Sequence, residues 1–369
     1  MTKIHPLARK HLLDNQCTVS GMPEKTWHTE KNCILDSNIN YYADSPYQHY
    51  PLDDNPQLSE TYIHFLKQEH CCKQGDVSSL SFLTPSHLLF ISASTAIDLL
   101  IRTFCEPALD KVCIFSPTFP LYAYCSLCQN TPVIDIPLIG RHYDRINTEK
   151  VSVESPKLLF IPSPNNPVGS IPCAEDILAL LQNTQSIVVI DEAYIEYADH
   201  LSFTPYIDAF PNLVILRSFS KIWGLAGIRC GVVLGDPMTI HTLKKLLTPY
   251  NFPAHTQEIL KGSLNQMQNI LEIRSIAKKD MQYLTEQMQA LSICLHVYPS
   301  ETNFVLVQFT NAKQVFHELY SLGFLVKDTS RVVPNTLRIS LGTTQNNERF
   351  IAALQHIDKK LSITTQPKL

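Results

Sequence analysis

The regular alternation of short apolar runs with helix-like segments is the feature that most constrains how this chain can fold. The runs are His87–Ser92, Lys111–Ser116, Thr131–Ile136, Lys157–Ile161, Ser186–Asp191, Leu213–Arg217 and Arg229–Gly235. Runs that are apolar nearly throughout are typical of strands buried on both faces of a mostly parallel sheet. Between them, Thr95–Phe104 and Ala174–Leu181 carry apolar residues three and four positions apart, as amphipathic helices do. The seven runs predict an α/β fold in which residues 45–250 form a large, doubly wound domain with a mostly parallel seven-stranded sheet.

The chain changes character after Pro249 and Pro253. The segment Thr256–Leu291 is rich in Gln and Met, and we expect it to form one long helix. The strand-like runs that follow are Cys294–Tyr298, Asn303–Phe309 and Thr336–Leu341. This order predicts a smaller α+β domain over residues 251–369. Residues 1–44 carry no core of their own, and we expect them to pack on the smaller domain or on a dimer partner.

The composition excludes several classes of function. Of the 369 residues, 44% are apolar and 17% are charged, and 30 Lys and Arg face 34 Asp and Glu for a formal charge of −4. Because no block of like charges occurs, nucleic acid is not an expected partner. No stretch has the apolar core of a signal peptide or the roughly 18 consecutive apolar residues of a membrane span. We therefore expect a cytoplasmic protein with no membrane partner.

The cysteines do not predict a metal site. Eleven of them are scattered from Cys17 to Cys294, which is typical of reduced thiols in a cytosolic protein. Two local pairs could suit metal or redox chemistry, Cys71-Cys72 and Cys125-Ser-Leu-Cys128. Zinc needs about four ligands, however, and the sequence has no second Cys pair or His cluster at a spacing that would complete either site. We expect no bound metal.

Polar groups follow the predicted strands at the sheet edge where ligands of doubly wound proteins bind. The segments are Ser92-Ala-Ser-Thr95, Ser116-Pro-Thr-Phe119, Pro162-Ser-Pro-Asn-Asn-Pro-Val-Gly169, Asp191-Glu-Ala-Tyr194 and Ser218-Phe-Ser-Lys221, with Arg229 further on. Taken singly, each has an ordinary interpretation as a helix cap, a turn or a surface residue. Together they supply hydroxyls and an arginine for a phosphate, an acid for a ring nitrogen, two polar groups for a phenolic oxygen, and an amine. That set predicts a site for pyridoxal 5'-phosphate.

Four motifs extend this interpretation to a family. They are Ser163-Pro-Asn-Asn-Pro-Val-Gly169, Val189-Ile-Asp-Glu-Ala-Tyr194, Ser218-Phe-Ser-Lys-Ile-Trp-Gly-Leu-Ala-Gly-Ile-Arg-Cys-Gly231 and Leu337-Arg-Ile-Ser-Leu-Gly342. Their order and spacing from about Leu35 to the C-terminus resemble the fold-type I pyridoxal-phosphate aminotransferases, and most of all the histidinol-phosphate aminotransferases. The resemblance implies a transferase of histidine biosynthesis.

The resemblance also implies roles for the residues that touch the cofactor ring. Lys221 would bind the cofactor covalently and move the proton between the substrate α-carbon and the cofactor. Asp191 would pair with the ring N–H, and Asn166 and Tyr194 would hold the phenolic oxygen. Phe119 would stack on the ring. Lys221, Asp191 and Tyr194 are the residues expected to be catalytic.

The remaining implied roles concern anionic groups. The cofactor phosphate would be held by Ala93 and Ser94 at a helix start, and by Ser218, Ser220 and Arg229. Tyr50 would reach the phosphate of a neighbouring subunit, which implies a homodimer with composite active sites. Arg338, together with Asn166, would bind the acidic group of the substrates, a small-molecule amino donor and a 2-oxo acid.

Several positions depart from the family pattern near the substrate. Ile39 stands where Glu is common, Phe119 where Tyr is usual, and Lys327 where a second Arg often occurs. The segment Ser92–Thr95 also lacks the usual acid. Histidinol phosphate with 2-oxoglutarate is the leading substrate pair. Another amino acid, aromatic or not, remains open as donor, as do decarboxylation of a phosphorylated amino acid and a non-catalytic regulatory role.

Overall fold

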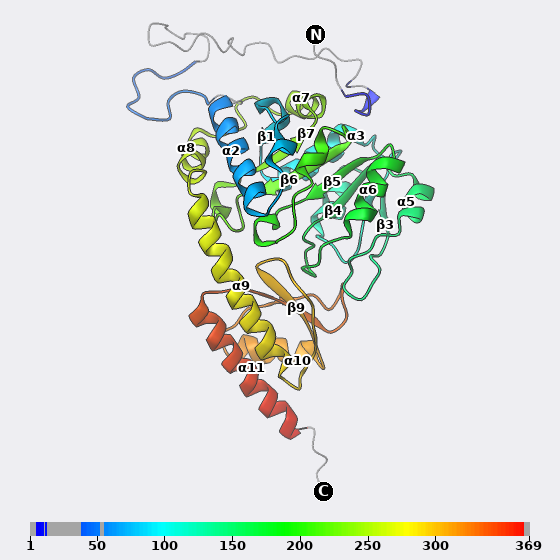
Figure 1. Cartoon of the computed structure of the whole chain (residues 1–369), viewed down its shortest axis with the longest axis vertical. Helices are drawn as coiled ribbons and strands as arrows, with labels where there is room; N and C mark the ends of the chain where they lie inside the picture. The colour runs from blue at the N-terminus through cyan, green and yellow to red at the C-terminus, as the bar shows by residue number, and fades with distance from the viewer. Residues whose placement is uncertain (1–4, 11, 13–37, 52–54, 365–369) are drawn as a thin grey trace.

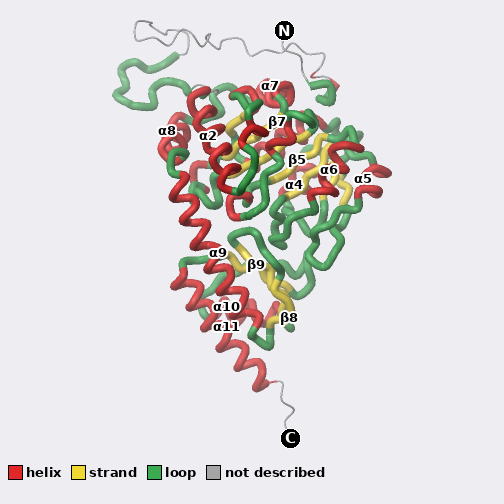
Figure 2. Tube along the Cα trace, viewed as in Figure 1, coloured by secondary structure: helices red, strands yellow, loops and turns green. Residues whose placement is uncertain are grey.

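The computed structural model describes residues 5–10, 12, 38–51 and 55–364 of the chain. Within these residues two β-sheets form separate units, the larger above and the smaller below in Figure 1. Helices flank the strands of both units, as the colouring by secondary structure in Figure 2 shows. The arrangement confirms the α/β fold with a mostly parallel seven-stranded sheet.

All the strands expected in the large sheet form. They are β1 (Leu88–Phe90), β2 (Val112–Ile114), β3 (Val133–Asp135), β4 (Leu158–Pro162), β5 (Ile187–Asp191), β6 (Leu213–Ser218) and β7 (Gly231–Gly235). Their order is β1-β7-β6-β5-β4-β2-β3. The five strands from β6 to β3 run parallel, and β7 is antiparallel to both β6 and β1. The carboxyl ends of β4, β5 and β6 therefore lie side by side.

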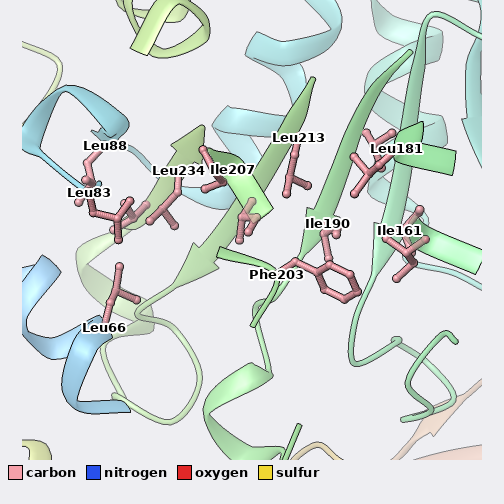
Figure 3. Packing of buried hydrophobic residues seen from close by; sticks show 14 of the residues in the cluster. Leu66, Leu83, Leu88, Ile161, Leu181, Ile190, Phe203, Ile207, Leu213 and Leu234 are labelled. Atoms are coloured by element: carbon pink, nitrogen blue, oxygen red, sulfur yellow. The ribbon is translucent and has the colours of Figure 1, made fainter. Parts of the chain in front are cut away.

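Alternation along the central strands explains why helices cover both faces. Val188 and Ile190 of β5 join a buried cluster with α2 and α6, whereas Ile187 and Val189 join a second cluster with α3, α4 and α7. Figure 3 shows part of the first cluster, to which both Leu66 of α2 and Ile190 of β5 belong. The helices are α2 (Pro56–Cys72), α3 (Ala93–Phe104), α4 (Leu121–Cys128), α5 (Thr148–Glu154), α6 (Ala174–Asn183) and α7 (Pro237–Lys245). Short 3₁₀ turns span Val77–Leu80, Pro85–His87, Ile195–Tyr197, Thr204–Ile207 and Ala226–Ile228.

The smaller sheet is antiparallel, with the order β10-β11-β9-β8. Its strands are β8 (Cys294–Val297), β9 (Phe304–Phe309), β10 (Lys327–Asp328) and β11 (Thr336–Ser340), and α10 (Ala312–Ser321) and α11 (Thr344–Thr364) pack beside it. The sequence predicted three of these strands and missed β10, because a two-residue strand is too short to show a period.

The prediction of a single long helix over Thr256–Leu291 was wrong, because the structure has two helices there. They are α8 (Ala254–Ser263) and α9 (Met267–Gln289), and the chain breaks at residues 264–266. Gly262 and Ser263, both weak helix formers, precede the break. The longer helix, α9, contacts α2 of the large unit as well as β8, β9 and α11 of the small one (Figure 1).

The described residues at the start of the chain differ from the expectation of packing on the smaller domain. The backbone N–H of His5 donates to Thr242 of α7 at 2.9 Å, and that of Arg9 donates to the carbonyl of Thr103 of α3 at 2.9 Å. These residues therefore pack on the large unit, where the His5 ring also lies edge-on against the ring of Phe104 in α3. Residues 13–37 lie outside the described part of the chain.

Candidate active site

A cavity of about 280 Å³ lies at the carboxyl ends of β4, β5 and β6. All the residues predicted for the site line it except Tyr50 and Arg338. Those present are Ala93, Ser94, Phe119, Asn166, Asp191, Tyr194, Ser218, Ser220, Lys221 and Arg229. They come from distant parts of the chain, and the parallel strands bring them to one edge.

One end of the cavity is built to hold an anion. Helix α3 begins there at Ala93, and its N-cap Ser92 accepts a hydrogen bond from the N–H of Thr95 at 3.2 Å. The first turn of this 12-residue helix lines the cavity, and the free N–H groups of a helix N-terminus can hold an anion. Arg229 reaches the same place, because its Nη2 donates to Ser94 Oγ at 3.1 Å. A positive charge and a helix N-terminus therefore meet at this end.

The serines after β6 complete this end. Ser218 Oγ accepts from the N–H of Ser220 at 3.2 Å, so the turn carries two hydroxyls beside the cavity. Gly231, paired with Ser218 across β6 and β7, permits the close approach. A Cβ at Gly231 would lie 2.3 Å from the carbonyl oxygen of Arg217 and 3.4 Å from the N of Ala93. Only glycine lets β6 and the start of α3 come this near.

The other end of the cavity holds a buried carboxylate. Asp191 is 7% exposed, and it accepts hydrogen bonds from the hydroxyl of Tyr122 at 2.7 Å and from the N–H of Ala193 at 3.1 Å. Burial raises the pKa of Asp191, whereas these two hydrogen bonds and the charge of Lys221 lower it. The carboxylate is thus held rigidly and made basic by its dry surroundings.

Tyr122 is a site residue that the sequence interpretation missed. It is fully buried on α4, stacked on Phe160 at 4.8 Å, and burial raises its pKa well above 10.0. The available signal was its position three residues after Phe119, at the start of the helix that follows β2, and both side chains line the cavity.

The amine lies beside an aromatic ring. Lys221 Nζ is 4.9 Å from the centre of the Tyr194 ring. Tyr194 in turn packs edge-on against Phe304 of β9, with ring centres 5.3 Å apart. The amine, the phenol and the smaller sheet therefore meet at the mouth of the site.

Arg338 reaches the site from β11. Its Nη1 donates to Asn166 Oδ1 at 2.6 Å, and its guanidinium lies over the Phe304 ring at 5.0 Å. Its Nε is buried and has no hydrogen-bond partner within the described residues. Lys327 of β10 pairs directly with Arg338 across the sheet, which places a second cation at this rim. Arg338 thus belongs to the neighbourhood of the cavity although it does not line it.

Tyr50 lies outside this cavity. It is 53% exposed and stacks on Tyr250 with ring centres 4.4 Å apart. Its own subunit therefore does not bring it to the phosphate end.

A metal cluster and a membrane-spanning helix are both absent from the described residues. No three His, Cys, Asp or Glu side chains gather there as a metal would require. In the same residues no helix has both the length and the apolar character needed to cross a membrane.

The cavity residues fit pyridoxal phosphate. A cup of hydroxyls, helix amides and Arg229 suits the phosphate, Asp191 at the opposite end suits the ring N–H, and Lys221 offers the amine. Phe119 supplies an aromatic wall between them. The fold and the site together define a pyridoxal-phosphate-dependent enzyme of fold type I.

Comparison with known proteins leads to the family. The family model for aminotransferase class I and II matches residues 23–354, and the chain belongs to this family. A histidinol-phosphate aminotransferase from Cytophaga hutchinsonii is 32% identical over 286 residues, covering 76% of this chain and 81% of the relative. One from Buchnera aphidicola subsp. Schlechtendalia chinensis is 36% identical over 280 residues, covering 73% and 78%. This chain is therefore a pyridoxal-phosphate-dependent aminotransferase.

A solved structure shows the same fold. Histidinol-phosphate aminotransferase from Sinorhizobium meliloti, in complex with pyridoxal 5'-phosphate, superimposes with a TM-score of 0.70 at 22% identity. The match covers 88% of this chain and 90% of that one.

Proposed function

We propose that this aminotransferase interconverts histidinol phosphate and imidazole-acetol phosphate, with 2-oxoglutarate and glutamate as the second pair, in histidine biosynthesis. The observation that carries the proposal is Arg338, whose guanidinium stands at the rim of the cofactor cavity and is bonded to Asn166. The names of the relatives at 32–36% identity support the same substrates. We further propose a cytoplasmic homodimer in which residues 45–250 bind the cofactor and residues 251–369 approach the substrate.

The proposed cofactor contacts follow from the two ends of the cavity. Arg229, Ser94, Ser218 and Ser220 would hold the phosphate together with the N–H groups that begin at Ala93. At the other end Asp191 would accept the hydrogen bond of the ring N–H. Asn166, whose Oδ1 accepts from Arg338, would donate through Nδ2 to the phenolic oxygen, and the hydroxyl of Tyr194 would donate to the same oxygen. Phe119 would cover one face of the ring.

Pyridoxal phosphate supplies an electron-accepting ring that stabilises negative charge at the substrate α-carbon. Lys221 would bind the cofactor at rest, take the proton from the α-carbon as a free amine, and return it to the adjacent cofactor carbon. The Tyr194 ring beside Lys221 Nζ limits where that amine can move. The carboxylate of Asp191 would hold a proton on the ring nitrogen, which would strengthen the ring as an electron acceptor.

Arg338 would bind the acidic group of each substrate in turn. A planar guanidinium suits the α-carboxylate of glutamate and the phosphate of histidinol phosphate. Lys327, opposite Arg338, adds a charge that favours a doubly charged phosphate over a single carboxylate.

The homodimer would complete the phosphate end. Residues 38–51 expose an unusual number of aromatic side chains, since Tyr41, Tyr42, Tyr47 and Tyr50 are all 45% exposed or more. Aromatic side chains are enriched in protein interfaces. An isologous contact over this segment would carry the Tyr50 of each subunit to the site of the other.

A panel of amino donors with 2-oxoglutarate tests the substrate. Histidinol phosphate, histidinol, phenylalanine, tyrosine and phosphothreonine are compared by kcat/KM. We expect histidinol phosphate to exceed histidinol by about a hundredfold or more, because loss of the phosphate leaves the Arg338 rim without its anion. A preference for tyrosine or phenylalanine, or release of carbon dioxide from phosphothreonine, would replace the proposed substrate.

A further inference from the structure

A cluster of buried charges lies directly behind the active site. Arg217, 2% exposed, forms ion pairs with Glu192 through Nε at 3.0 Å, with Glu196 through Nη1 at 3.1 Å, and with Glu69 through Nη2 at 3.0 Å. Lys73 pairs with Glu69 at 3.1 Å. We call these five residues the Arg217 cluster. None of them lines the cofactor cavity.

Strand alternation explains where the cluster lies. Ser218 and Asp191 line the cavity, whereas Arg217 and Glu192 are their direct neighbours in the sequence. Neighbouring residues in an extended chain point to opposite sides. The Arg217 cluster therefore occupies the α2 side of the same two strand ends that carry cofactor contacts on the α3 side.

The cluster ties three pieces of chain together. Arg217 belongs to β6, Glu192 and Glu196 follow β5, and Glu69 belongs to α2. The carboxylate of Glu192 also accepts from Ser202 Oγ at 2.7 Å and from the N–H of Phe203 at 2.8 Å. Together these contacts hold the turn after β5 from two sides, and that turn carries Tyr194.

A second contact holds this turn. Lys73 Nζ donates to the carbonyl oxygen of Ile195 at 2.7 Å, immediately after Tyr194. The end of β5 and its turn are thus fixed by side chains from β6 and α2.

Stability alone does not account for such a cluster. Removing charges from water costs several kcal/mol per ion, and apolar replacements of buried ion pairs are often as stable. Three carboxylates and two cations also leave one surplus negative charge when all are ionised. What ion pairs add over apolar packing is fixed direction, because each pair specifies which atoms meet.

We propose that Arg217 is a positioning residue for the cofactor. By bridging Glu192 and Glu196, it holds the end of β5 and the following turn against the end of β6. It thereby fixes Asp191 and Tyr194 relative to Ser218 and Lys221. The inference depends on the cofactor and not on which amino donor reacts.

The first test replaces Arg217 by lysine, which keeps one charge but cannot reach three carboxylates. Titration of the apoenzyme with pyridoxal 5'-phosphate should give a Kd about tenfold higher or more. Amide hydrogen exchange of residues 191–197 in the apoenzyme should become faster. Arg145→Lys is the matched control, since Arg145 forms a bidentate pair with Asp176 away from the site. It should leave the Kd within about twofold of wild type.

The second test compares two carboxylates of the Arg217 cluster and works even if Arg217→Lys does not fold. Glu192→Gln and Glu69→Gln remove the same charge, but only Glu192 lies beside Asp191. We expect Glu192→Gln to raise the cofactor Kd about threefold or more and to shift the absorbance maximum of the bound cofactor. Glu69→Gln should lower Tm and change the Kd and the absorbance maximum less, because Glu69 is connected to the turn only through Arg217 and Lys73. Equal Kd increases in both variants, or an unchanged Kd in folded Arg217→Lys, would show that the cluster only supports the fold.

Discussion

The cofactor end and the substrate end of the site are built differently. At the cofactor end the charged groups already have protein partners, as Asp191 has Tyr122 and Arg229 has Ser94, and all come from the large unit. At the substrate end Arg338 comes from the smaller sheet and bonds across to Asn166. The first end depends on one sheet, whereas the second depends on how two sheets meet.

The two constructions predict which properties of the enzyme respond to which substitution. Groups held by partners within the same unit cost little to organise when a ligand binds. Cofactor affinity should therefore be insensitive to changes in the smaller sheet. Substrate selection should be sensitive to them, because it needs Arg338 at the rim.

The largest effect is expected at Lys221. Proton transfer by a positioned group typically contributes 10²–10⁴-fold, so Lys221→Ala should lose transamination by about three orders of magnitude or more. The variant should still bind pyridoxal phosphate, without a covalent link. Borohydride reduction followed by peptide mapping should find the pyridoxyl group on Lys221 of wild type and on no residue of the variant. Lys261→Ala, at an exposed position of α8, is the control. A label on a different lysine would reject the assignment.

Arg338→Met separates the two ends. Charge-assisted hydrogen bonds contribute about 1.5–3 kcal/mol each, so kcat/KM for the phosphorylated donor should fall about a hundredfold or more. The Kd of pyridoxal phosphate should stay within about twofold. Exposed Arg331→Met serves as the control in the same sheet unit. An equal loss of cofactor affinity would mean that the two ends are not independent.

Tyr50→Phe tests whether the cofactor end extends into a second subunit. Loss of one hydrogen bond to a charged group should weaken cofactor binding about ten- to a hundredfold while the dimer persists. Mixing Tyr50→Phe with Lys221→Ala subunits should partly restore activity, because a heterodimer then has one site with neither defect. No recovery after proven subunit exchange would place Tyr50 outside the neighbour's site.

The sequence predicted which residues gather at the cavity because its signals are local. Each strand end is followed by its polar residues within a few positions, and parallel strands bring such ends together. The surroundings of those residues were not predictable in the same way. Tyr122 resembled any apolar-face residue of a short helix, and its bond to Asp191 spans 69 positions.

Long-range charge pairing was the second gap. In the sequence, Arg217 is only the last residue of a predicted buried strand, and its ion-pair partner Glu69 lies 148 positions earlier. No periodicity links an arginine to carboxylates on another helix. The break between α8 and α9 was missed for a related reason, since amphipathic spacing continues on both sides of it.

Tyr122→Phe tests the support behind the ring-nitrogen carboxylate. The variant removes one hydrogen bond to Asp191, so cofactor affinity and turnover should each fall about tenfold. Because that hydrogen bond lowers the pKa of Asp191, its loss should raise this pKa. The acid limb of the activity profile should then move to higher pH. Tyr124→Phe, on the exposed side of α4, is the control. An unshifted acid limb would assign Tyr122 to packing alone.

The smallest effect on catalysis is expected for Glu196→Gln, which keeps an oxygen for Arg217 but removes a titrating carboxyl group from the Arg217 cluster. Burial raises the pKa of Glu196 from 4.5 to about 7, with the nearby charge of Glu69 adding to it against the opposing charge of Arg217. Its Oε2 has no hydrogen-bond partner within the described residues and can carry the proton. The charges of Arg217 and Lys73 outweigh burial at Glu69 and bring that pKa to about 2.

The sign of the stability change follows from these pKa values. Between pH 4.5 and about 7 the folded protein keeps a proton on Glu196 that the unfolded chain releases, so the free energy of unfolding falls as pH rises. From pH 5 to 8 this amounts to about 2–3 kcal/mol. Glu69 acts oppositely, because its contribution is lost as pH falls from 4.5 toward 2. Urea denaturation should therefore show a shallower decline above pH 5 for Glu196→Gln than for wild type, with turnover nearly unchanged. Parallel stability curves for the two proteins would place the surplus proton on another group.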